Sequence, residues 1–168
     1  MFKKIALLVL CALPFSLMAQ EVKLGHINSQ EILSLMPERT TIEKTISDLQ
    51  AQWEKEIAKM REEYFAKTKE YQEKQATMPE SIKQARQSEI AEMEQRISTT
   101  GQNAQTDLQK KSQDLFAPVI EKVKKAINEV GAENGYLYIF DLGAQSIIYQ
   151  SPKSNDVTAL VKKKLALK

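Results

Sequence analysis

Two long stretches of the sequence place apolar residues three and four positions apart. The first, residues 38–77, contains no Gly or Pro, and its Ile42, Trp53 and Tyr64 lie eleven residues apart. The second follows Pro79 and keeps this spacing, which corresponds to about 3.67 residues per turn and is typical of a nearly straight helical coil. The two stripes comprise Ile42, Ile46, Leu49, Trp53, Ile57, Met60, Tyr64, Tyr71 and Met78, and then Ile82, Ile90, Met93, Ile97, Ala104, Leu108, Leu115 and Val119. The pattern predicts two long helices whose apolar residues have the same spacing.

Pro79 lies at the midpoint of these stretches and supplies a place for the chain to reverse. We therefore expect an antiparallel helical hairpin over residues 38–116, with its tip near residues 77–80. Each arm of roughly 37 residues would be about 55 Å long, which exceeds the diameter of a compact domain of this size. The outer positions mix acidic and basic residues, as a solvated coil face requires.

The hairpin interrupts a smaller body made of residues 20–37 and 117–168. Residues 22–27 alternate as a strand does, and Asn28 can cap a short helix that follows and ends near Pro37. Beyond Pro118 the second helix continues until Gly131 or the Asn134-Gly135 pair ends it. Two further strands, Tyr136–Phe140 and Ile147–Tyr149, are expected to form a hairpin buried on both sides, before Asn155 or Asp156 caps a last helix.

These elements predict an α+β fold that is mostly α, with a long coiled-coil arm projecting from a small β body. The body is so small that its core is marginal alone, and its short strands cannot cover their own edges. We therefore expect homo-oligomerisation, with the strands of several copies closing into a barrel. The residues expected to make these contacts are Val22, Leu24, Leu137, Ile139, Ile147 and Tyr149.

The composition offers little for catalysis. The 168 residues include a single His, His26, and a single Cys, Cys11, which excludes a His/Cys metal site with several ligands and a Cys-His nucleophile pair. No phosphate-binding Gly-x-x-x-x-Gly-Lys sequence occurs. Carboxylates are plentiful on the arms, but nothing places a pair of them in a cleft. We expect no enzyme activity, no catalytic residue, no cofactor and no metal, and we expect His26 to be a structural residue of the first strand.

The first 19 residues resemble a cleavable secretory signal. Lys3 and Lys4 precede a short apolar run, and Ala19 provides the small residue before the cut. Cleavage would remove two of the 24 basic residues and none of the 22 acidic ones, leaving a neutral mature chain without a thiol. We expect export and no nucleic-acid partner. Residues 152–168 still carry five Lys and one Asp, which permits a weak contact with a membrane surface or lipopolysaccharide.

Several segments together resemble the Skp (OmpH-like) family of periplasmic chaperones. They are the strand-to-helix join Val22–Leu33, the Tyr136–Phe140 segment and the ending Ser154–Leu165, with Asp156-Val157-Thr158 at the helix start. The resemblance implies a trimer whose strands build a central β-barrel and whose hairpins surround a cavity that holds unfolded outer-membrane proteins. It implies no cofactor or ATP. Many relatives are strongly basic, whereas this mature chain is neutral.

Two functions remain open at this point. The leading hypothesis is an ATP-independent holdase, whose arms shield an exported, non-native chain through weak and distributed contacts. The alternative is an exported coiled-coil structural or adaptor protein that binds a folded envelope partner. Between Tyr64 and Ile90 the apolar stripe thins, and adaptable side chains become prominent. The residues expected to contact a client are Met60, Tyr64, Phe65, Tyr71, Met78, Ile82 and Met93.

Overall fold

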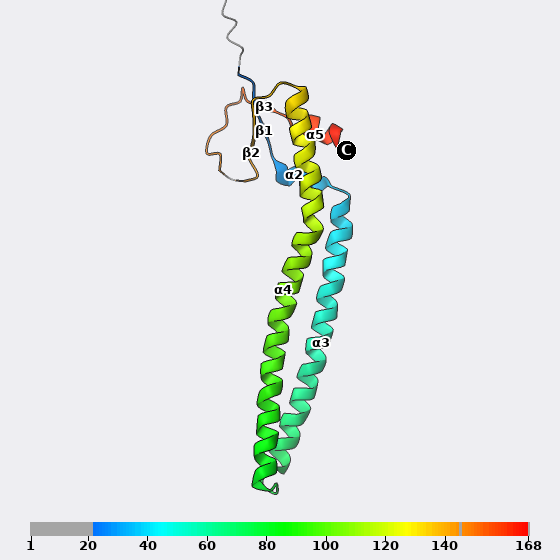
Figure 1. Cartoon of the computed structure of the whole chain (residues 1–168), viewed down its shortest axis with the longest axis vertical. Coiled ribbons are helices and arrows are strands. Elements are labelled where there is room, and N and C mark those ends of the chain that lie inside the picture. The colour runs from blue at the N-terminus through cyan, green and yellow to red at the C-terminus, as the bar shows by residue number, and fades with distance from the viewer. Residues whose placement is uncertain (1–21, 145, 168) are drawn as a thin grey trace, which may run out of the picture.

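A computed structural model describes residues 22–144 and 146–167, so the predicted signal in residues 1–19 lies outside the described part of the chain. The elements are β1 (Leu24–Ile27), α2 (Ser29–Leu35), α3 (Glu38–Lys74), α4 (Glu80–Glu133), β2 (Tyr138–Asp141), β3 (Asn155–Asp156) and α5 (Thr158–Lys164). Figure 1 shows α3 and α4 side by side as a long arm, with the other elements gathered at one end. The molecule is a mostly helical α+β protein, as the sequence predicted.

The arm is an antiparallel hairpin of one 37-residue and one 54-residue helix. At the tip, the backbone N–H of Gln75 donates to the carbonyl of Tyr71 at 2.9 Å, and that of Thr77 donates to the carbonyl of Lys74 at 3.0 Å. Pro79 then has an extended backbone, with ψ at 146°, which no helical residue adopts. The reversal therefore falls at Gln75–Pro79, close to the predicted position.

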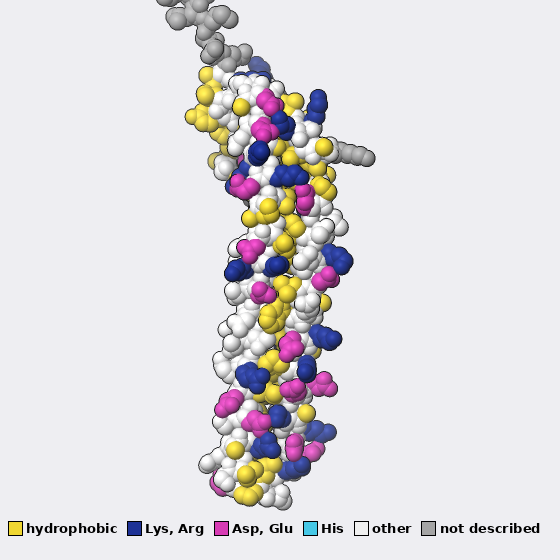
Figure 2. Space-filling view, turned by 45° about the vertical axis from the view of Figure 1, so that its right-hand side comes forward, with side chains coloured by type: hydrophobic (Ala, Val, Ile, Leu, Met, Phe, Trp, Pro, Cys, Tyr) yellow, Lys and Arg dark blue, Asp and Glu magenta, His cyan; other side chains and the backbone are white. Residues whose placement is uncertain are grey.

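The seam between α3 and α4 buries the predicted stripe most fully near the body. Ile42, Ala104 and Val119 are buried on that side, and Met60 and Met93 are buried about halfway along the arm. Figure 2 shows apolar side chains along the arm between charges of both signs. Cross-seam contacts fix the register, and they join Lys122 Nζ to Glu38 Oε1 at 2.6 Å, Trp53 Nε1 to Asp107 Oδ2 at 3.1 Å and Lys67 Nζ to Glu89 Oε1 at 2.5 Å. Equal steps along the two helices thus stay opposite one another.

Helix α4 runs from the tip of the arm into the body without a break. Pro118 lies inside it, and the residues that follow extend the buried stripe through Val123 and Val130. The helix ends at Asn134, and Gly135 follows with a φ of +68°, a conformation that glycine adopts at little cost. Of the two predicted ends, the Asn134-Gly135 pair is the one observed, whereas Gly131 is buried inside the helix.

The body core joins residues from β1, α2, α4 and α5. Ile27, Ile32, Val157 and Val161 are almost completely shielded from solvent. Burial of each such side chain contributes about 1.5–3 kcal/mol. Asn28 caps α2 as predicted, since its Oδ1 accepts a hydrogen bond from the N–H of Glu31 at 3.3 Å.

The sheet differs from the prediction, because all of its strands are parallel, in the order β2-β1-β3. The predicted hairpin of 136–140 with 147–149 is therefore wrong. Ile147–Tyr149 belong to no strand but to the segment 142–154, which leaves the end of β2 and returns to place β3 on the opposite side of β1. Ile147–Tyr149 were predicted as a strand because they are apolar and include β-branched residues. In the structure, the polar residues Asn155 and Asp156 of β3 pair with that edge of β1 instead.

Asp141 ties the end of β2 to the start of α2. Its Oδ1 accepts hydrogen bonds from the N–H groups of Ser29 at 3.0 Å and Gly143 at 2.9 Å, and its Oδ2 accepts one from the hydroxyl of Ser29 at 2.6 Å. Burial alone would raise the pKa of Asp141, but these hydrogen bonds outweigh it and hold the pKa below its ordinary value of 3.8. The ionised Asp141 carboxylate therefore stabilises the fold fully above its ordinary pKa. This stabilisation is lost as the pH falls through the lowered pKa of the folded protein.

We therefore expect Asp141→Asn to lower the free energy of unfolding by about 1–3 kcal/mol at neutral pH, because an amide cannot accept all three hydrogen bonds. The difference from the wild type should shrink in acid, where the wild-type carboxylate becomes protonated. Chemical denaturation followed by circular dichroism at several pH values measures both effects. Asp48→Asn, which removes an exposed ion pair with Lys44 within one helix, is the matched control and should change stability much less.

Candidate functional site

The outward face of the sheet carries exposed apolar side chains. The parallel register pairs Leu24 with Tyr138 and His26 with Phe140, so these four side chains share one face. Tyr138 and Phe140 stack with ring centroids 6.0 Å apart, and they remain 61% and 43% exposed. Exposed apolar clusters of this kind mark interaction surfaces in soluble proteins. We call Leu24, Tyr138 and Phe140 the sheet face.

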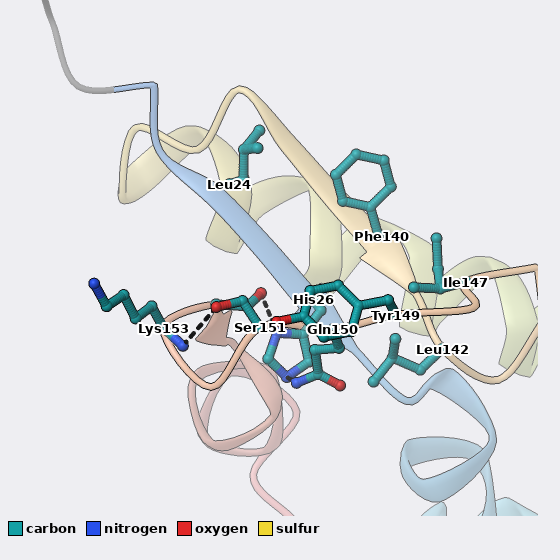
Figure 3. Close-up of a pocket in the computed structure, with 10 residues that line it drawn as sticks. Leu24, His26, Phe140, Leu142, Ile147, Tyr149, Gln150, Ser151 and Lys153 are labelled. Carbon is teal, nitrogen blue, oxygen red and sulfur yellow. Dashed lines mark hydrogen bonds between the residues drawn. The ribbon is translucent and has the colours of Figure 1, made fainter.

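Beside the sheet face lies an apolar hollow of about 510 Å³, which the segment 142–154 borders (Figure 3). It is lined by Leu24, His26, Phe140, Leu142, Ile147, Tyr149, Gln150, Ser151, Lys153 and Ser154. His26 is buried and its two ring nitrogens lie 2.7 Å from Ser154 Oγ and 2.7 Å from Gln150 Nε2. His26 therefore fastens this segment to β1, which agrees with the structural role predicted for it.

Strand β2 has a neighbour on one side only. Within the described chain it pairs with β1, and its outer edge carries backbone groups that no other strand of the chain pairs with. Such an open edge adds strands from other chains readily. Because β2 carries both the open edge and two residues of the sheet face, Tyr138 and Phe140, this end of the molecule is suited to contact with strands of further copies.

The residues expected at an oligomer contact differ in their exposure in the structure. Val22, Leu24, Leu137 and Tyr149 are exposed, and Ile147 lines the hollow. Ile139 is different, because it is half-buried against α4, and a methyl group added at Gly131 would lie 3.3 Å from its Cδ1. The prediction that Ile139 contacts a partner chain came from strand alternation, which does not say which face of a two-sided apolar strand meets the chain's own helix.

The residues expected to contact a client fall into three groups by their exposure. Phe65 and Ile82 are 65% and 48% exposed, and the ring of Phe65 packs edge-on against Tyr64 with centroids 5.6 Å apart. Met60 and Met93 are instead buried in the seam, at 8% and 7% exposure. The half-buried members are Tyr64, Tyr71 and Met78. In this closed arrangement, the two methionines stabilise the hairpin and present little surface to another chain.

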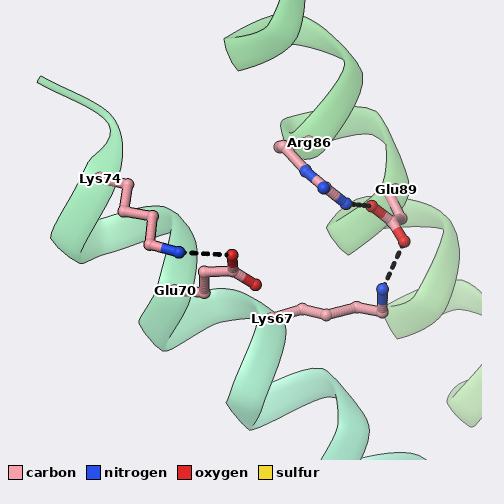
Figure 4. A network of polar contacts seen from close by, with 5 residues as sticks. All are labelled: Lys67, Glu70, Lys74, Arg86 and Glu89. Atoms are coloured by element: carbon pink, nitrogen blue, oxygen red, sulfur yellow. Dashed lines mark hydrogen bonds and ion pairs between the residues drawn. The ribbon is translucent and has the colours of Figure 1, made fainter. Parts of the chain in front are cut away.

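A group of five charges, which sequence reasoning did not single out, lies near the tip (Figure 4). Glu89 of α4 accepts hydrogen bonds from Lys67 of α3 at 2.5 Å and from Arg86 at 2.6 Å, and Lys74 pairs with Glu70 at 2.9 Å. The hydrogen bonds from Lys67 and Arg86 lower the pKa of the Glu89 carboxyl. We call these five residues the distal ion network, and its Lys67–Glu89 bond joins the two helices.

The Lys-rich C-terminal helix is largely paired within the chain. Lys162 Nζ lies 2.6 Å from a carboxylate oxygen of Glu31, and Lys164 Nζ lies 2.5 Å from Glu133 and 3.1 Å from Glu129. The hydrogen bonds to Glu133 and Glu129 raise the pKa of Lys164. These contacts fix α5 on the body and lower the charge that the predicted membrane-surface contact would use.

Within residues 22–144 and 146–167, no helix is both long enough and apolar enough to cross a membrane. No cluster of three or more carboxylate, imidazole or thiol side chains in this part of the chain could hold a metal ion.

A long helical hairpin on a small sheet with an open edge defines an arm-bearing, mostly helical α+β protein. The family model described as Outer membrane protein (OmpH-like) matches residues 23–165. The chain therefore belongs to the OmpH-like family. It is 23% identical over 154 residues to the chaperone protein Skp of Yersinia enterocolitica, with 92% of each chain covered.

The fold also matches a crystal structure from Caulobacter crescentus that is described as an OmpH-like outer membrane chaperone. The TM-score is 0.69 at 14% identity, over 84% of this chain and 82% of the other. This similarity supports the overall fold.

Proposed function

We propose that this protein is a periplasmic, ATP-independent holdase that binds unfolded outer-membrane proteins between helical arms and prevents their aggregation. The observation that carries the proposal is the separation of two surfaces. The sheet lies at one end of the arm (Figure 1), and the exposed Phe65 of α3 and Ile82 of α4 lie nearer the tip. A molecule built in this way can assemble through one end and enclose another chain with the other.

Assembly into a homotrimer completes the proposal. The open edge of β2 and the sheet face both favour contact with further copies, and closure of their strands into a barrel would remove the free edges. Contacts made by Val22, Leu24, Leu137, Ile147 and Tyr149 would bury apolar surface that a single chain leaves exposed. The arms of three copies would then surround a common cavity.

The chemistry needed for a holdase is weak and distributed contact. Aromatic and flexible side chains such as Phe65 and Met78 adapt to many apolar partners without a fixed geometry. No catalytic step, cofactor or nucleotide is part of the proposal, and the signal predicted in residues 1–19 would deliver the chain to the periplasm. The neutral mature chain makes apolar contact, rather than long-range attraction, the main source of client affinity.

The test is dilution of a urea-denatured outer-membrane β-barrel protein into buffer that contains the mature protein, at one trimer per client. We expect turbidity to be suppressed without ATP, and the complex to elute as a single soluble species. A folded preparation of the same client should not bind. If the client aggregates at its unassisted rate, the holdase proposal is wrong and an adaptor that binds folded partners is favoured.

A further inference from the structure

The seam of the arm changes character about halfway along its length. Near the body it is closed by buried apolar residues, the last of which are Met60 and Met93. In the fully described stretch between these two residues, no side chain is buried. The hydroxyl oxygen of Thr68 is shielded from solvent there and has no hydrogen-bond partner among the described residues, so the packing is imperfect.

Polar contacts close the distal seam in place of apolar packing. Lys67 bonds Glu89 across the helices, and the side-chain amide of Gln87 donates to the hydroxyl of Tyr71 at 2.7 Å. The distal ion network borders a small hollow whose apolar lining is Tyr71, Met78 and Ile90. These charges therefore lie over the side chains that would be uncovered if the two helices parted.

Such a closure is weak and depends on ionic strength. The side chains of Lys67 and Glu89 are 37% and 40% exposed, and ion pairs at this exposure contribute little to stability and are screened by salt. The proximal seam depends less on charge, because burial of Ile42, Ala104 and Val119 closes it in addition to the Lys122–Glu38 ion pair. The distal part can thus open while the proximal part stays closed.

We propose that residues 64–90 form a latch in which the Lys67–Glu89 bond closes the distal hairpin, and in which opening presents Tyr71, Met78 and Ile90 to an extended apolar segment of a client. The part of this inference that concerns the client rests on the proposed holdase function. The opening itself does not, since it is a property of the arm alone.

Amide hydrogen exchange of the mature protein without client tests the opening. Peptides from residues 64–90 should exchange about two- to five-fold faster at high salt than at low salt, as loss of an exposed ion pair predicts. Peptides from residues 42–57 should not change. Glu89→Gln should give the fast rate at both salt concentrations. The matched control is Glu43→Gln, which breaks the 2.6 Å pair with Arg39 within α3 and should leave distal exchange unaltered.

A second variant tests the consequence for client binding. Lys67→Met combined with Glu89→Leu replaces the charged contact with an apolar one, so distal exchange should become slow and independent of salt, and protection of a denatured outer-membrane protein should fall. The latch is overturned if Glu89→Gln exchanges like the wild type. Its role with the client is overturned if the closed variant protects as well as the wild type. Failure of the wild type to protect overturns the holdase function and leaves the exchange result standing.

Discussion

Deletion of residues 61–96, with the cut closed by a short Gly-containing turn, is expected to abolish protection of a diluted outer-membrane protein while leaving the oligomer intact. The cut joins α3 to α4 where they already face one another, since Met60 lies beside Gln95 and Thr99 across the seam. The proximal seam and the whole body core are retained. The deletion removes the exposed Phe65 and Ile82, and with them most of the reach of the arm.

Light scattering and circular dichroism on the shortened protein check that it is still assembled and helical, and a turbidity assay measures protection. The control is the full-length protein at the same concentration of assembled particles. If the shortened protein suppresses aggregation fully, the arms are not the client-binding surface. If it no longer assembles, the boundary between body and arm at residues 116–117 is misplaced.

Phe140→Asp is expected to dissociate the oligomer and leave a folded monomer. Phe140 is 43% exposed on the sheet face, so a single chain tolerates the change, whereas a contact between copies would bury an unpaired carboxylate. That burial costs several kcal/mol at each contact, and each 1.4 kcal/mol is tenfold in affinity, so assembly should weaken by at least about 100-fold. Analytical ultracentrifugation over a range of concentrations measures the shift.

Phe65→Asp is the matched control, because it makes the same substitution at an exposed phenylalanine on the distal arm. It should assemble like the wild type. A Phe140→Asp protein that keeps the wild-type mass at micromolar concentration would exclude the sheet face from the oligomer contact. Ile139→Asp would be a less informative change, since Ile139 packs against α4 and its loss would disturb the monomer as well.

The helical hairpin could be predicted closely because its information is local and repeated. An eleven-residue period over two long stretches, with Pro79 between them, determines two helices, their facing sides and the place of reversal. Asn28 as a cap and Asn134-Gly135 as a helix end are likewise short-range signals. Each depends on backbone geometry within one or two turns, so no knowledge of distant contacts was needed.

The sheet could not be predicted in this way, because strand pairing depends on contacts between distant segments. Ile147–Tyr149 have the composition of a strand, yet the edge of β1 is occupied by Asn155 and Asp156. Nothing in the local pattern of Tyr136–Phe140 shows that Ile139 faces α4. Burial of one apolar face by the chain's own helix and exposure of the other is a tertiary property.

The prediction of client-binding residues was limited by a similar ambiguity. A methionine on a helical stripe fits both a seam and an adaptable binding surface, and the structure assigns Met60 and Met93 to the seam. The Lys67–Glu89 contact of the distal ion network could have been predicted from the sequence, because counting equal numbers of residues back and forward from the tip places Lys67 opposite Glu89. Mixed charges on a coil face are common, so the pattern alone did not distinguish these residues from solvated neighbours.

An arm with an eleven-residue period can change its length only in discrete steps. Met93, Ala104, Leu115 and Ala126 form one continuous row along α4, because eleven residues complete about three turns and return a side chain to the same face. Since α3 and α4 run antiparallel in register, a block inserted in one helix requires an equal block in the other. Paired blocks of this kind would lengthen the arm by about 16 Å each. If the arms enclose a client as proposed, evolution or engineering can therefore adjust the size of the enclosed client in such increments, without altering the body.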